Sequence, residues 1–171
     1  MKTIYILITS MVLMFSLNSN AQIVKAEIRA TGLTCSMCSN AINKQLKTVP
    51  EVVNVEIDLN TNTFTVTLKE GNELSPKIFK EKVEKAGFFI GSLVVTAKSN
   101  TITQSSYIMV NDKKSNASEI QFQVVDKGYV TEKEFKKLSK AYKNIDRYES
   151  NNEDDFHIKM INKRESELYI L

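Results

Sequence analysis

The stretch VKAEIRATGLTCSMCSNAINKQL, residues 24–46, contains two different hydrophobic periods separated by one turn. From Val24 to Ala30 every second residue is apolar and the residues between them are charged, which predicts a half-buried strand. A turn follows at 31–34. Beyond it, apolar side chains recur at helical spacing as far as Leu46, and Pro50 ends the predicted helix. The stretch therefore predicts a strand that leads through a short turn into a helix.

Three further elements follow this strand and helix. Residues 53–59 and 64–68 each alternate apolar with polar side chains, and Asn60-Thr61-Asn62 between them predicts a β-hairpin. Ser75-Pro76 predicts the start of a second helix with a serine cap, and Gly87 predicts its end. Residues 88–95 are apolar on both faces, which is typical of a central strand. The order strand, helix, strand, strand, helix, strand predicts an α+β, ferredoxin-like βαββαβ domain over residues 22–97.

The remainder of the chain predicts a second unit. Residues 98–106 are polar and indicate a linker to a small mixed α/β domain at 107–171, which resembles no family that we recognise. Strands are expected at 107–110, 120–124, 156–160 and 167–171. Thr131 and Glu134 have the spacing of a capping box at the start of an amphipathic helix. His157 alternates with apolar neighbours, and we expect it to face solvent.

The first 21 residues have the layout of a secretory signal peptide. Lys2 precedes an apolar run that ends near Leu17, and the small residues Ser19 and Ala21 fit cleavage after Ala21. The run is shorter than the roughly 20 residues that span a bilayer, and no later stretch is apolar enough to do so. The sequence therefore predicts export, to the bacterial periplasm foremost or by secretion, without a membrane span after signal removal. Exported thiols meet an oxidising environment and must be metallated, reduced or paired.

Composition excludes several function classes. The 171 residues carry 23 basic and 20 acidic side chains, a net charge of +3, which gives no electrostatic footprint for nucleic acid. Two cysteines cannot make a disulfide-dense scaffold, and one histidine cannot make a histidine-rich metal site. We find no glycine-rich phosphate loop or nucleophile elbow and expect no enzyme. Lysine-rich faces at 77–85 and 133–140 predict solvated helix surfaces, with docking of an acidic partner as the alternative.

Cys35 and Cys38 are the candidate metal ligands. One lies in the predicted turn and the other at the start of the helix, so both sulfurs can reach one ion. A helix N-terminus favours the thiolate, which is the form that binds metal, and thiolates select soft ions such as Cu(I). Two ligands are too few for a closed zinc site, which takes four. A CxxC pair alone also fits a disulfide, a redox pair or two buried small side chains.

Residues 23–96 resemble a heavy-metal-associated domain, the module of copper chaperones, of copper-pumping ATPase amino-terminal repeats and of periplasmic mercury-binding proteins. The family motif G-M-T-C-x-x-C reads here Gly32-Leu33-Thr34-Cys35-Ser36-Met37-Cys38, with leucine in place of the usual methionine. The resemblance extends to Ala86-Gly87-Phe88. It implies that Cys35 and Cys38 bind one Cu(I) as a bis-thiolate, that Leu33 anchors the loop and that Phe88 covers it.

These observations predict an exported, non-enzymatic metallochaperone or metal store. Cu(I) is the expected ion, with Hg(II), Ag(I) and Zn(II) as alternative occupants. The expected partner is a donor or acceptor of metal, such as a copper-transporting ATPase or another exported metalloprotein. Two alternatives stay open: a thiol–disulfide oxidoreductase that uses the CxxC pair, and a partner-binding module whose metal loop is vestigial.

Overall fold

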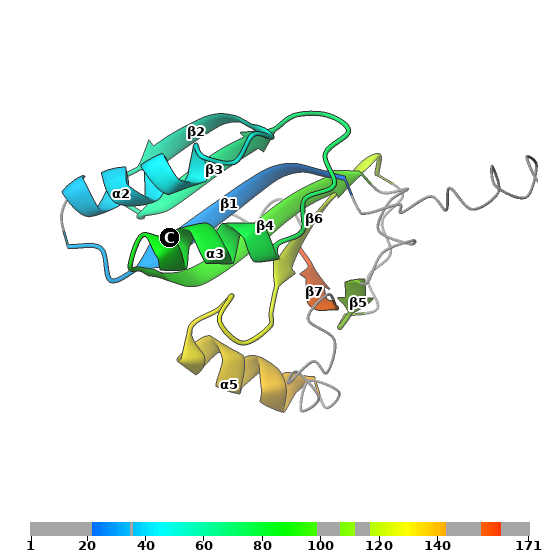
Figure 1. Ribbon diagram of the computed structural model, residues 1–171. Helices are drawn as coiled ribbons and strands as arrows, with labels where there is room; N and C mark the ends of the chain where they lie inside the picture. Colours follow the sequence, from blue (N-terminus) through cyan, green and yellow to red (C-terminus); the bar gives the residue numbers. More distant parts are fainter. Residues whose placement is uncertain (1–21, 35, 99–106, 112–116, 143–154, 162–171) are drawn as a thin grey trace, which may run out of the picture.

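The computed structural model of the chain describes residues 22–34, 36–98, 107–111, 117–142 and 155–161 (Figure 1). The predicted signal peptide, Cys35, most of the predicted linker and the predicted strand at 167–171 lie outside these ranges. The described elements are, in chain order, β1 (Ile23–Thr31), α2 (Ser36–Leu46), β2 (Val52–Asp58), β3 (Thr63–Leu68), α3 (Lys77–Lys85), β4 (Phe89–Lys98), β5 (Tyr107–Met109), β6 (Glu119–Val124), α5 (Glu132–Ala141) and β7 (Phe156–Met160).

The first six of these elements form the predicted ferredoxin-like unit. Strands β2, β3, β1 and β4 lie in that order and pair antiparallel. Helices α2 and α3 contact each other and lie side by side over one face of these strands (Figure 1). Between helices and sheet the side chains of Ile28, Phe64, Phe79 and Leu93 are all 0% exposed. Each such burial contributes about 1.5–3 kcal/mol to folding, so this interface is the main core of the unit.

Strand β2 differs from its predicted pattern at one residue. Simple alternation placed Val53 on the same face as Val55, but Val53 is 62% exposed and Val55 is 7% exposed. The register of β2 against β3 shifts between Val52 and Asn54, as at a β-bulge. The shift turns Val53 outward and lets Val52 pack against the core in its place.

The two ends of α3 are built differently. The residue that caps its N-terminus is Pro76, and no side chain caps this end, so the predicted serine cap is wrong. At the C-terminus, Gly87 adopts φ +89° and its N–H donates to the Glu84 carbonyl at 2.8 Å. The Phe88 N–H donates to the Val83 carbonyl at 3.2 Å. This pair of bonds is a Schellman ending, and it directs the chain into β4.

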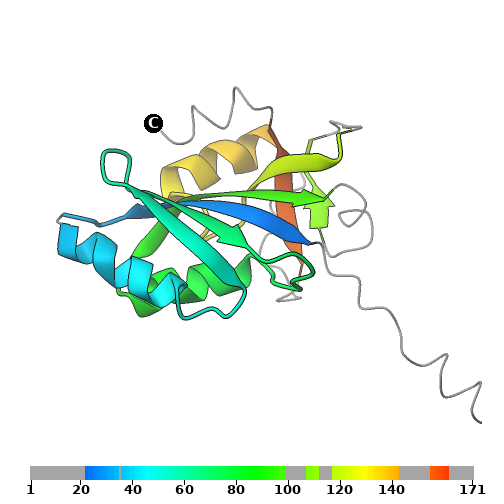
Figure 2. The same ribbon diagram turned by 90° about the horizontal axis from the view of Figure 1, so that it is seen from above.

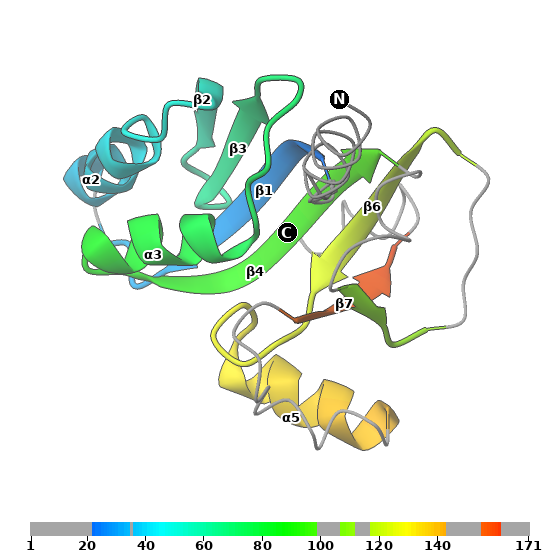
Figure 3. The same ribbon diagram turned by 45° about the vertical axis from the view of Figure 1, so that its right-hand side comes forward.

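The sheet does not stop at β4. Residues 93–98 of β4 pair antiparallel with β6, which pairs with β7, and β7 pairs in parallel with β5 (Figure 3). Within the described residues the result is one sheet of seven strands in the order β2-β3-β1-β4-β6-β7-β5. The expected small second domain therefore has no sheet of its own here, because its strands extend the first unit's sheet. We call residues 107–161 the extension, of which the structure describes 107–111, 117–142 and 155–161.

One continuous hydrophobic core joins the extension to the first unit. Phe122 is 0% exposed, and its ring centroid lies 5.3 Å from that of Tyr107. Tyr129 meets Phe156 edge to face at 5.9 Å, and the Lys80 ammonium of α3 lies 5.4 Å from the centre of the Tyr129 ring. Because β4 has neighbours on both edges and is buried from Ile90 to Ala97, the prediction that this strand is central is confirmed.

Helix α5 lies on the opposite side of the sheet from α2 and α3 (Figure 2). The predicted capping box is half confirmed, because the Thr131 hydroxyl accepts from the Glu134 N–H at 3.3 Å. The Glu134 carboxylate accepts instead from the Gln123 amide of β6 at 3.0 Å. Leu138 is the only residue of α5 that is buried, and it packs in a small cluster with Val125. The helix is therefore attached by few contacts.

His157 does not face solvent, and that prediction is wrong. The residue is 8% exposed, and its backbone N–H and its Nδ1 each lie 2.8 Å from an oxygen of the Asp126 carboxylate. Burial raises the pKa of Asp126, and the hydrogen bonds from His157 act in the opposite direction. The pair ties β7 to the residues that follow β6.

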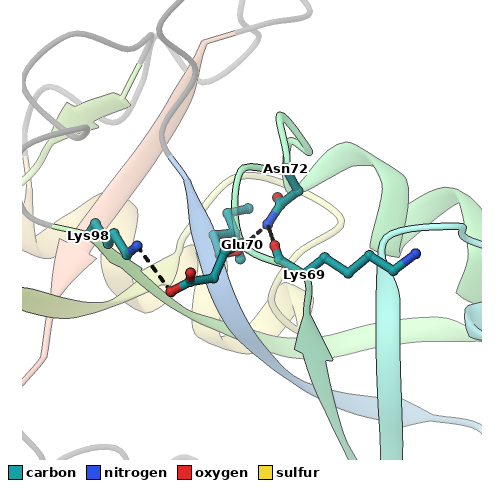
Figure 4. A network of polar contacts seen from close by, with 5 residues as sticks. Lys69, Glu70, Asn72 and Lys98 are labelled. Atoms are coloured by element: carbon teal, nitrogen blue, oxygen red, sulfur yellow. Dashed lines mark hydrogen bonds and ion pairs between the residues drawn. The ribbon is translucent and has the colours of Figure 1, made fainter.

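The segment between β3 and α3 is fixed by one buried amide. Asn72, which is 7% exposed, donates through Nδ2 to the Ile23 carbonyl at 2.7 Å and to the Lys69 carbonyl at 2.6 Å (Figure 4). Nearby, Lys98 pairs with Glu70 at 3.4 Å. These contacts lie where β1 begins, at the end of the sheet opposite the turn that precedes α2.

No helix in the described parts of the chain is both long enough and apolar enough to cross a membrane.

Candidate metal centre

The loop between β1 and α2 leaves the sheet in a conformation that favours glycine. Gly32 adopts φ +86°, a left-handed region that costs other residues roughly 1–2 kcal/mol. The next residue, Leu33, is half-buried and packs against the core, whereas Thr34 is exposed. The implied role of Leu33 as the loop anchor agrees with this packing.

The two predicted ligands differ in what the structure describes. Cys35 lies outside the described residues, so its place remains a prediction. Cys38 lies in the first turn of α2 and is half-buried. The next residue, Ser39, is 2% exposed and faces the core. The two residues before Cys38, Ser36 and Met37, are exposed to solvent. Cys38 thus lies on the boundary between the exposed and the buried side of the helix.

The start of α2 is electrostatically suited to a thiolate. Its first turn carries no acidic residue. The first turn of a helix also has backbone N–H groups without partners inside the helix and a partial positive charge. A sulfur anion at Cys38 is therefore stabilised by the helix, with no carboxylate in that turn to oppose it.

Phe88 lies beside the loop, as the resemblance implied. A Cβ placed on Gly32 would be 3.9 Å from Cδ1 of the Phe88 ring. Phe88 is partly buried and packs against the core. The Schellman ending of α3 fixes its backbone, so the ring is held next to the loop by both helix and sheet.

Two apolar side chains are exposed next to this loop. Met37, in the first turn of α2, is 79% exposed, and Phe89, the first residue of β4, is 68% exposed. Met37 lies between the two cysteines of the motif, so its exposed side chain is available to a second protein that approaches them. The exposure of Phe89 could not be predicted from the sequence. In a run that is apolar on both faces, no pattern indicates which residue will be exposed to solvent. Exposed apolar residues that gather at one place are typical of interaction surfaces.

Other titratable groups do not gather into a metal site among the described residues. No cluster of three or more His, Cys, Asp or Glu side chains that could hold a metal is found there. His157 and Asp126 form the buried pair between β6 and β7, away from the loop.

A ferredoxin-like unit whose CxxC motif leads from the turn after the first strand into the first helix defines a class of metal-binding modules. The family model of the heavy-metal-associated domain matches residues 27–89, so this part of the chain is a heavy-metal-associated domain. The identification predicted from the motif is confirmed.

Comparison with individual proteins gives matches to part of the chain. Over 57 residues, 33% of the chain, the sequence is 42% identical to the copper-transporting ATPase of Saccharomyces cerevisiae. The match spans only 6% of the length of that ATPase.

Two solved structures are also similar to part of the chain. The N-terminal domain of a potential copper-translocating P-type ATPase from Bacillus subtilis, solved in the Cu(I)-loaded state, is 35% identical. The match covers 39% of this chain and 81% of that one, with a TM-score of 0.35. A yeast copper transporter domain, solved in apo and Cu(I)-loaded states, is 36% identical, with 39% and 90% covered and a TM-score of 0.36.

Proposed function

We propose that this chain is an exported carrier of Cu(I), which Cys35 and Cys38 hold as a bis-thiolate. The observation that carries the proposal is a CxxC motif at the junction of β1 and α2 in a heavy-metal-associated domain. Relatives of that domain bear the names of copper transporters, and two of them were solved with Cu(I). The soft thiolate donors of the motif match the same ion.

The site suits transfer of the ion better than permanent storage. Two thiolates leave Cu(I) with few ligands, so an incoming thiolate from a partner can bind before one of the resident sulfurs leaves. Thr34, just before the motif, and Met37, inside it, are both exposed, which supports approach by a second protein. The chain therefore acts as a binding protein that exchanges metal, not as a catalyst.

We further propose that the chain works after export, in the periplasm of a bacterium foremost. The support is the sequence of residues 1–21, with its charged start, apolar run and small residues before the expected cleavage point. In such a compartment the cysteines oxidise unless metal or a reducing partner protects them. The partner is accordingly an ATPase that moves copper or another exported metalloprotein.

Native mass spectrometry of reduced residues 22–171 tests this proposal. Cu(I), Ag(I) and Zn(II) are offered in competition, to the wild type and to the Cys35→Ser and Cys38→Ser variants. We expect a single bound Cu(I) in the wild type and loss of that ion in both variants. Preference for Zn(II), or metal retained equally by both variants, would refute the assignment. Reduction of insulin disulfides by the metal-free protein would instead support the oxidoreductase.

A further inference from the structure

A groove of about 790 Å³ is lined by residues of both the domain and the extension. One wall consists of residues at the end of β1 and the start of β4, among them Thr31, Phe89 and Ile90. The other wall consists of the turn before α5 and of α5 itself, including Val130 and Phe135. Residues 127–139 of this second wall lie outside the matched family region. We call this feature the α5 groove.

The α5 groove opens next to the metal loop. Thr31 is the last residue of β1 and pairs with Phe89, whose carbonyl accepts a hydrogen bond from the Thr31 hydroxyl at 3.3 Å. Gly32 follows Thr31, and Phe88, whose ring lies beside Gly32, precedes Phe89. A protein that reaches the loop to exchange metal therefore also meets the exposed Phe89 ring and the mouth of the groove.

Lysines are in excess on both sides of the α5 groove. Residues 127–142 contain five lysines and two glutamates, and all five lysines are exposed. Helix α3 contains four lysines and two glutamates, and its Glu84, which lines the groove, lies 3.9 Å from the Lys80 ammonium. Lys127 and Lys136 line the groove itself, as does Glu132. The lining itself carries two lysines and two glutamates, so the lysine excess belongs to the two helices that flank the groove.

We propose that the α5 groove receives an acidic segment with apolar side chains from the protein that exchanges metal with this chain. Apolar side chains of that segment pack on Phe89 and Phe135, and its carboxylates face Lys127 and Lys136. The extension thereby selects the partner, and the loop performs the exchange. A second copy of this chain fits poorly, because its lysine excess would face the same excess here. The proposal rests on the proposed function, since the loop gives the partner its reason to dock.

Binding of short fluorescein-labelled peptides, followed by anisotropy, tests the α5 groove. The probe contains Glu, Asp, Leu and Phe, and two matched peptides replace either its acidic residues by Lys or its apolar residues by Ser. We expect the acidic apolar peptide alone to bind, with chemical-shift changes at Thr31, Phe89 and Val130. The variant Lys127→Glu/Lys136→Glu, which reverses both charges, should lower the affinity for the peptide by about tenfold or more. The loss of affinity should be larger at low salt. Phe89→Ser should also lower the affinity.

Lys69→Glu is the matched control, because Lys69 is an exposed lysine at the opposite end of the sheet (Figure 4). Absence of binding, equal binding of the lysine peptide, or equal weakening by Lys69→Glu would overturn the proposal. Cu(I) affinity is measured on the same variants. It should be unchanged in Lys127→Glu/Lys136→Glu, and it should be lost in Cys38→Ser while the peptide still binds. The two proposals can therefore fail separately.

Discussion

Replacing Phe122 by alanine tests whether the extension and the metal-binding domain form one cooperative unit. Phe122 lies on β6 with 0% exposure. It pairs with Val95 of β4 on one side and Met160 of β7 on the other, and its ring contacts that of Tyr107. Truncation of a buried phenylalanine removes its burial and leaves a cavity, which together cost about 3–5 kcal/mol. We expect Phe122→Ala to lose that much unfolding free energy.

The measurement is urea unfolding of reduced residues 22–171, with NMR amide signals as reporters from both parts of the sheet. Signals from β1 and β3 should lose stability together with those from β6 and β7, because one core connects them. The conservative variant Phe122→Leu should show the same joint shift with a smaller loss than Phe122→Ala, because leucine fills part of the cavity. The contrary result is that β1 and β3 keep the wild-type urea midpoint while β6 and β7 unfold at lower urea. The two parts would then be independent domains, and the sheet would not unfold as one cooperative unit.

Three further predictions concern particular residues. Gly87→Ala should lower the unfolding free energy by roughly 1–2 kcal/mol, since φ is +89° and open space surrounds the new methyl group; a neutral result in urea unfolding would contradict this. Asp126→Ala should cost about 1–3 kcal/mol, because it removes the acceptor of the buried His157 N–H, and Asp126→Asn should cost less; equal stability of all three proteins would refute the pairing. Hydrogen bonds from the Asn60 N–H and the Thr61 hydroxyl hold the pKa of Asp58 below 3.8, so its stabilising contribution is present above pH 3.8 and is lost as pH falls through the lowered pKa. An NMR titration of Asp58 should show this value rising in Thr61→Val, and a titration unchanged by that variant would argue against the turn geometry.

The local elements could be predicted because each is encoded by neighbouring residues. The strand over residues 24–30, the turn at Gly32 and the helix that follows have their signals within a few positions, and the family motif lies among them. The glycine that ends α3 was predicted for the same reason, and it adopts the left-handed conformation that this role requires.

The features that sequence reasoning missed depend on distant partners. Alternation at 120–124 predicts a strand but does not say that β4 will be its neighbour, so the shared sheet was not foreseen. His157 was predicted to be exposed, but Asp126, 31 residues earlier, pairs with it in the interior. The bulge that turns Val53 outward depends on the register with β3. In each case a long-range contact decided the outcome.

The α5 groove could not be predicted for a related reason. Its walls come from residues near 31, 89 and 127–139, which only the folded sheet brings together. The lysine-rich faces were visible in the sequence, but their position around the α5 groove was not.

The most direct test of the central claim is the Cu(I) affinity of the full reduced chain, residues 22–171, measured by competition with a chromogenic Cu(I) chelator. Wild type, Cys35→Ser, Cys38→Ser and the control Ser36→Ala are compared, since Ser36 is an exposed residue between the two cysteines. Tight binding of one Cu(I) by the wild type and by Ser36→Ala, and its loss in both cysteine variants with the fold intact, is the result we predict. Wild-type affinity retained in either cysteine variant would contradict the bis-thiolate site.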